Sequence, residues 1–177
     1  TAADIEAEVA FDLRDALARE PGISVPRDPQ RFNAGGVTVR GLGGNRVLVE
    51  TDGVPGARSF AVGSFSNTGR QFADLEVVER IELLRGPASA LYGSDAIAGV
   101  LAITTLDPAG LLGDGADGVL RTRAGHAGDD GSTVAGLTGA LRAGPLAGLL
   151  AFARREGGEL DHAGGLPRAN PRDYASD

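Results

Sequence analysis

The sequence contains no cysteine and no methionine, and none of its basic residues is lysine. Without cysteine the chain forms no disulfide and offers no thiolate to a metal. Without methionine it carries no translation start, so we expect a processed or excised piece whose upstream signals have been removed. No apolar run reaches the ~18 residues that a transmembrane helix needs. These absences exclude a disulfide scaffold, a cysteine-based zinc site and a helical membrane anchor.

Positively charged residues are also fewer than negatively charged ones. All 17 basic residues are arginine, against 24 acidic residues, and the formal net charge is -7. Nucleic acid phosphates require a concentrated positive surface, and the arginines of this chain are scattered along the sequence. The composition therefore excludes a nucleic-acid-binding function.

Glycine is abundant instead. It accounts for 28 of 177 residues, more than twice the usual share of about 7%. The glycines are not periodic and alternate with valine, leucine and threonine, and the hydrophobic content of 42% is sufficient for a folded core. This pattern predicts short strands joined by tight turns.

The first hundred residues combine helical and extended patterns. Leu13, Ala16 and Leu17 share one face of a helix predicted over residues 12–20, which Pro21 ends. A second short helix is predicted from Pro87 to Tyr92. Segments with strand character lie at residues 23–25, 37–40, 46–50, 77–84 and 100–105.

Residues 53–70 are predicted to form a long polar loop. The segment is rich in glycine, serine and asparagine, with Phe60 and Phe65 as its only aromatic residues. Long loops in compact domains are usually functional. We therefore take this segment as a candidate binding loop.

The pattern changes after Pro108. A connection rich in glycine and aspartate occupies residues 109–118, and residues 156–177 form a polar tail that predicts an exposed loop. Between them lie segments of the ~9–11 residues that a tilted membrane strand needs. These three predicted strands are residues 119–127, 133–142 and 146–155. The fold prediction is an α+β domain over residues 1–108, followed by the first antiparallel strands of a transmembrane β-barrel over residues 119–177.

No group of residues predicts catalysis or a resident cofactor. The glycine-rich segment 41–46 lacks the third glycine of a dinucleotide loop and is followed by a strand instead of a helix. Glu79 and Glu82 lie on opposite faces of a strand and form no carboxylate pair. His126 and His162 have no metal-ligand neighbours at the usual spacing. The sequence therefore predicts that this is not an enzyme, with no bound metal or cofactor.

Two arginines have matching surroundings. Arg40 ends a predicted strand as Val-Arg-Gly, and Arg85 ends another as Leu-Arg-Gly. The glycine that follows allows the backbone to turn sharply while the guanidinium projects from the strand end. Arginine binds carboxylates through two parallel hydrogen bonds and tolerates a partly buried interface. Two unrelated surface arginines are the alternative, and the matching contexts favour a shared interface.

Several segments together resemble the plug domain of TonB-dependent outer-membrane receptors. Residues 78–94 read VERIELLRGPASALYGS and continue through AIAGV at residues 96–100. Residues 13–25 are similar to the early helix and strand of the family, and residues 37–41 and 46–54 to its central motifs. Order and spacing agree across about residues 1–106, whereas the remainder carries little signature.

The resemblance implies a small mixed sheet with short helices lodged inside an outer-membrane barrel of about 22 strands. It also implies that TonB, driven by the proton gradient across the inner membrane, pulls a short N-terminal box and remodels the plug. That box and the first plug strand would precede Asp4. Because only about three barrel strands follow the plug, we expect a fragment or an incomplete gene product that cannot transport by itself.

The resemblance also assigns roles to residues. It implies that Arg40 and Arg85 contact glutamates in barrel strands beyond this chain, a pair of contacts that we call the plug–barrel lock. It implies that residues 53–70 are the apical loop that meets substrate on the extracellular side. Its candidate substrate-facing residues are Arg58, Phe60, Phe65, Asn67 and Arg70.

The substrate is narrowed by the resemblance but left open. Residues 43–47, 52–54 and 58–60 look most like the subgroup of receptors for haem or haemoglobin. The apical loop contains no histidine to coordinate haem iron, and His126 lies beyond the plug. A ferric siderophore is the second candidate, and cobalamin ranks below both. A plug-like signalling module that reports occupancy to a regulator is the competing class.

Overall fold

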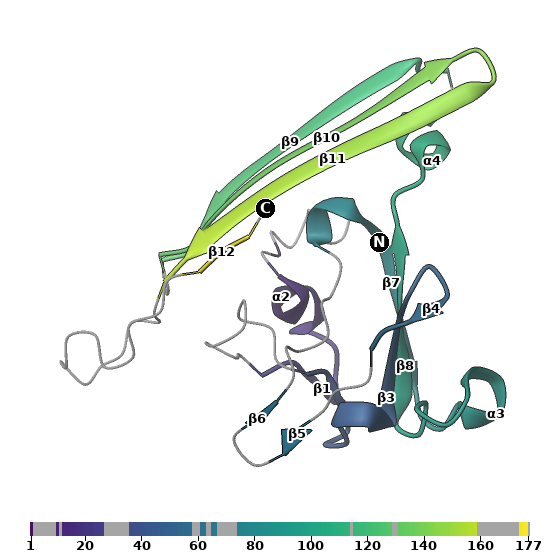
Figure 1. The fold of residues 1–177 in the computed structure, drawn as a ribbon, viewed down its shortest axis with the longest axis vertical. Helices are drawn as coiled ribbons and strands as arrows, with labels where there is room; N and C mark the ends of the chain where they lie inside the picture. Colours follow the sequence, from purple (N-terminus) through teal and green to yellow (C-terminus); the bar gives the residue numbers. More distant parts are fainter. Residues whose placement is uncertain are drawn as a thin grey trace. The chain divides into compact units, whose positions relative to one another are not determined.

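The computed structural model describes two compact units, which divide between Thr105 and Leu106 (Figure 1). Unit 1 is Thr1–Thr105 and unit 2 is Leu106–Asp177. Within these units the structure describes residues 1, 10, 12–26, 36–57, 61–62, 65–66, 74–113, 115–128, 131–158 and 174–176.

Unit 1 is built on a four-stranded mixed sheet with the order β4-β3-β8-β7. The two central strands, β3 and β8, run parallel, and each outer strand pairs antiparallel with its neighbour. Figure 1 shows the long strands of this sheet side by side. The bounds are Val47–Thr51 for β3, Val54–Pro55 for β4, Val78–Arg85 for β7 and Gly99–Thr105 for β8.

Both faces of the central strands are covered. Val49 and Leu101 are paired in register and belong to the larger core cluster, which also contains Leu13 and Leu17. Leu48 and Val100, also paired in register, pack with Ala88 and Ala96 on the other face. Parallel strands covered on both faces require continuous apolar runs, and this explains why β3 and β8 are rich in valine and leucine.

The larger core is closed by helix α2 (Leu13–Leu17) and by a two-stranded sheet. The Asp12 carboxylate accepts a hydrogen bond from the Asp15 N–H at 2.9 Å and caps the helix. The small sheet pairs β1 (Ile23–Ser24) with β2 (Thr38–Val39). The helix predicted over residues 12–20 therefore exists but ends at Leu17, because the N–H groups of Ala18 and Glu20 bond carbonyls only three residues back.

The connection between β7 and β8 folds back on itself. The Gly86 N–H donates to the Ala98 carbonyl, and the Ala88 N–H to the Ala96 carbonyl, each at 2.9 Å. Helix α3 (Ser89–Tyr92) lies inside this connection. Pro87 was predicted to open this helix, but the helix begins two residues later: Ala88, whose backbone is not helical, is the N-cap.

The segment predicted as one long loop, residues 53–70, contains short strands. Thr51 pairs with Val54 across an Asp52-Gly53 turn, and the Gly56 N–H donates to the Val49 carbonyl at 2.7 Å. The turn therefore sends the chain back along β3 as β4. Two further strands, β5 (Ala61–Val62) and β6 (Phe65–Ser66), pair antiparallel. Among the described residues of unit 1, 3-10 helices occupy Gly44–Arg46 and Leu75–Val77.

Unit 2 begins with a helix that the sequence pattern did not predict. Helix α4 (Pro108–Leu112) lies in the segment expected to be an irregular connection. The Asp107 carboxylate accepts hydrogen bonds from the N–H groups of Ala109 and Gly110 at 3.0 and 3.1 Å. An aspartate N-cap followed by proline at the first helical position is a strong start signal, and it outweighs the glycines that follow.

A four-stranded antiparallel sheet forms the rest of unit 2, with the order β12-β11-β10-β9. Three of its strands correspond to the predicted ones. The fourth, β12, pairs with the end of β11 and lies in the tail predicted to be a loop. The bounds are Gly118–His126 for β9, Thr133–Ala143 for β10, Leu146–Gly157 for β11 and Tyr174–Ser176 for β12.

Exposure alternates along β9 and β11, as expected when the two faces of a sheet meet different surroundings. One face carries large apolar side chains that are 45% to 79% exposed, and we call it the apolar face. The other face carries the buried side chains of Val134, Thr138 and Ala140. The large side chains of the apolar face are Leu120, Leu137, Leu141, Leu146, Leu150 and Phe152.

Among the described residues, no helix is long and apolar enough to cross a membrane.

Candidate functional site

Arg40 lies in a tight turn at the end of β2. The Val39 N–H donates to the Leu42 carbonyl at 2.8 Å, and the Leu42 N–H donates back to Val39 at 3.0 Å. The two residues between them, Arg40 and Gly41, have φ angles of 50° and 81°. Positive φ at both central positions is the pattern of a type I′ turn.

This backbone is unusual for arginine. Asp52-Gly53 adopts the same kind of turn, with φ angles of 50° and 76°, and aspartate and glycine are the residues that such turns favour. For most other residues the left-handed conformation costs about 1–2 kcal/mol. Arg40 is therefore held in a conformation that its own backbone disfavours, which is typical of functional positions.

The Arg40 side chain lies over the turn that follows α2. The backbone N–H of Arg40 donates to the Gly22 carbonyl at 2.6 Å, and a Cβ on Gly22 would lie 3.4 Å from the Arg40 Cγ. Arg40 is exposed, and within the described part of the chain its guanidinium forms no ion pair. The guanidinium is therefore available to a carboxylate from elsewhere.

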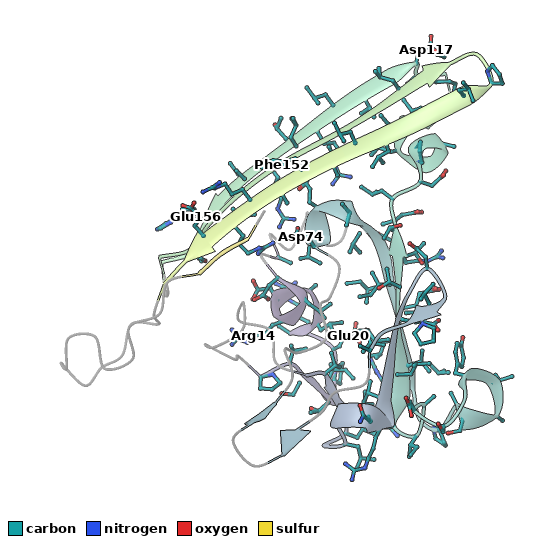
Figure 2. The ribbon with its side chains drawn as sticks, viewed as in Figure 1. Arg14, Glu20, Asp74, Asp117, Phe152 and Glu156 are labelled. Atoms are coloured by element: carbon teal, nitrogen blue, oxygen red, sulfur yellow. The ribbon has the colours of Figure 1, made fainter. Side chains whose placement is uncertain are left out.

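Arg85 is the last residue of β7, where it pairs with Gly99 of β8. Its Nη2 atom donates to the Glu20 Oε2 atom in an ion pair that spans 65 residues of sequence. The two side chains are 34% and 45% exposed, so the pair is accessible to solvent and to partners. Figure 2 shows Glu20 between α2 and the strands of the four-stranded sheet.

The two predicted arginines therefore contact the same short turn. Arg40 holds it through the Gly22 carbonyl, and Arg85 through the Glu20 carboxylate. Gly99 allows the strand ends to approach, since a Cβ there would lie 2.5 Å from the Leu84 carbonyl oxygen and 3.4 Å from a Val39 methyl. The sequence pattern predicted both arginines as site residues, but it did not predict that Glu20 would pair with Arg85.

A second contact missed by the sequence ties β3 to the end of unit 1. The Asp52 carboxylate accepts hydrogen bonds from the Thr105 N–H at 2.9 Å and from the Thr105 hydroxyl at 2.7 Å. The hydrogen bond from the Thr105 N–H, followed by that from its hydroxyl, lowers the pKa of Asp52, because both stabilise the ionised carboxylate. The pair Asp52-Gly53 is typical of a turn, whereas its role in holding β8 depends on tertiary contacts.

Four of the predicted substrate-facing residues, Arg58, Phe60, Asn67 and Arg70, lie outside the described residues. Phe65 belongs to β6, but its side chain also lies outside the described part. The apical-loop assignment therefore stays a prediction.

His126 ends β9, and its side chain is exposed on the apolar face. His162 lies outside the described residues. Among the described residues, no cluster of three or more histidine, aspartate or glutamate side chains could hold a metal ion. His126 shares the apolar face with Leu120.

Comparison with known proteins identifies the family. Residues 1–100 match the family model described as TonB-dependent Receptor Plug Domain. This match covers more than half of the chain. The protein belongs to the TonB-dependent receptor plug domain family, as the sequence resemblance predicted.

The similarity to one individual relative extends beyond the plug. The chain is 34% identical to a hemin receptor of Yersinia pestis over 163 residues, which cover 92% of this chain and 23% of the receptor. It is 42% identical to the vitamin B12 transporter BtuB of Vibrio vulnificus over 103 residues, 58% of this chain and 16% of that protein. The chain spans about a quarter of the hemin receptor and less of BtuB.

A solved structure supports the fold of both units. The apoprotein of the FrpB iron transporter from Neisseria meningitidis superimposes with a TM-score of 0.72 at 25% identity, covering 92% of this chain and 24% of that one. The predicted fold class, a mixed plug domain followed by antiparallel strands of a barrel receptor, is confirmed.

Proposed function

We propose that this chain is the gate of a TonB-dependent outer-membrane receptor that takes up haem or another iron-containing nutrient. The observation that carries this proposal is the share of the chain that is similar to the Yersinia hemin receptor. It covers 92% of the chain, whereas the likeness to the B12 transporter covers 58%. The longer likeness includes strands of unit 2 as well as the plug, and this favours an iron-containing cargo over cobalamin.

The two arginines give the gate a means of attachment. In the proposed receptor, Arg40 and Arg85 bind barrel glutamates and hold the plug in place. Arg40 has an accessible guanidinium, and Arg85 keeps part of its surface exposed beside Glu20. Arg58, Phe60, Phe65, Asn67 and Arg70 are the proposed substrate-facing residues of the apical loop. The proposed partners are TonB, the remaining barrel strands and outer-membrane lipid, which would contact the apolar face of unit 2.

Haem titration of the intact receptor that carries this chain tests the substrate. We expect a shifted Soret band at micromolar haem, and TonB-dependent growth with haem as the sole iron source. A strain without TonB is the matched control and should not grow. An unchanged spectrum together with growth on a ferric siderophore would replace haem with a siderophore. Growth that does not require TonB would contradict TonB-dependent uptake by this receptor.

A further inference from the structure

The guanidinium of Arg85 uses only part of its hydrogen-bonding capacity on Glu20. A guanidinium carries five N–H donors, and the Glu20 contact is made through Nη2 alone. Arg85 has 34% of its side chain exposed, so other donors remain accessible to a second carboxylate. Arg85 can therefore bind a second carboxylate without first releasing Glu20.

Glu20 also fixes where those donors point. An arginine side chain that becomes ordered only on binding loses rotamer freedom, and this loss weakens the association. The Glu20 contact orders Arg85 before any partner arrives. This differs from Arg40, which has no ion-pair partner among the described residues and is positioned by its own turn and by the Gly22 carbonyl.

The position of Glu20 is in turn set by the core. It follows α2, whose Leu13 and Leu17 are buried in the larger core cluster. On its other side, β1 pairs with β2 through Ile23 and Val39. The Glu20 carboxylate therefore lies between two segments that are fixed by packing and by strand pairing.

We propose that Glu20 is a positioning residue of the plug–barrel lock. It holds the Arg85 guanidinium ready for a barrel carboxylate and couples that contact to the position of α2. This inference rests on the lock in the proposed function. The ligand it concerns is a carboxylate side chain, bound by the donors of Arg85 that Glu20 leaves unused.

Passive leakage of a small solute through the intact receptor tests the inference in a double-mutant cycle. The variants are R85A, E20Q and the double variant, all compared at equal amounts in the outer membrane. We expect R85A to raise leakage and E20Q to raise it by roughly two- to five-fold, the range of a partly exposed ion pair. The double variant should leak no more than R85A alone, because Glu20 acts only through Arg85.

Glu82→Gln is the matched control. Glu82 forms an exposed ion pair with Arg80 at 3.4 Å on the same strand, with side chains 60% and 48% exposed, but this pair does not connect two elements. We expect its leakage to stay at the wild-type level. Arg85→Lys is a second control. It keeps the positive charge but loses the planar guanidinium that can bind a carboxylate through two hydrogen bonds, so this variant should leak more than the wild type.

The outcomes separate the two proposals. Wild-type leakage in R85A would overturn the lock itself. Raised leakage in R85A with wild-type leakage in E20Q would overturn only the role of Glu20. Reduced leakage in E20Q would mean that Glu20 competes with the barrel carboxylate, and additive effects in the double variant would mean that it acts elsewhere; either result overturns positioning.

Discussion

The two units use similar apolar side chains in opposite ways. In unit 1, Leu101 of β8 is fully buried between neighbouring strands and α2. In unit 2, Leu150 of β11 is 79% exposed, and no residue of that strand is buried. Unit 1 is therefore stabilised by its own core, whereas the apolar face of unit 2 lacks such a cover among the described residues. The apolar pattern of a β-strand alone therefore does not reveal what the apolar face of that strand packs against.

The largest expected difference comes from truncating one leucine in each unit. Leu101→Ala should lower the free energy of unfolding of unit 1 by about 2–5 kcal/mol, because it leaves a cavity in a packed core. Leu150→Ala should change stability in water by less than about 0.5 kcal/mol, because the side chain is exposed. Denaturant unfolding of the chain measures both. Equal losses would contradict the distinction between the two units.

A smaller difference is expected from adding one methyl group at a glycine in each unit. Gly99→Ala would place its Cβ against the Leu84 carbonyl and should destabilise unit 1 by about 1–3 kcal/mol. Gly110→Ala meets nothing within 4 Å in helix α4 and should stabilise it by about 0.5–1 kcal/mol. Thermal unfolding should move in opposite directions for the two variants. A neutral Gly99→Ala would show that the strands can separate at this point.

The smallest expected effect is a pH dependence confined to unit 1. The folded-state pKa of Asp52 is lowered, so its contribution is present above the unfolded pKa of about 4 and is lost as pH falls through the folded value. Asp52→Asn should flatten this acid dependence, and Thr105→Val should flatten it only in part, since the backbone N–H remains. Both effects should be smaller than that of Gly99→Ala, because the carboxylate is exposed to solvent. Unfolding measured at pH 7 and at pH 3 checks the order.

Much of the fold could be predicted because the local signals agree. The strand predicted over residues 77–84 lies within one residue of the observed bounds of β7, and the Asp52-Gly53 pair is typical of the turn found after β3. Helix α4 was missed although Asp107 and Pro108 mark its start, because the glycines around it suggested a loop. Strand β12 was missed because its strand partner, not its own composition, defines it.

Only part of the candidate site could be predicted from the sequence. Arg40 and Arg85 share a local context that can be read directly from the sequence. The Glu20 contact depends on the path of the chain between α2 and β7, and no short pattern contains both residues. The same holds for Asp52 and Thr105, which are 53 residues apart. Contacts of this kind become visible only after the strands are paired.

The parallel pairing of β3 with β8 also sets an order of events during synthesis. Val47 pairs with Gly99, so β3 must wait for about fifty further residues before its central neighbour exists. At ordinary synthesis rates of 5–20 residues per second, this wait lasts roughly 3 to 10 s. During it, β3 is paired only with β4, and its other edge is open to wrong pairing. Unit 1 is therefore most prone to wrong strand pairing before β8 is synthesised, and a factor that shields apolar strands would matter most in that interval.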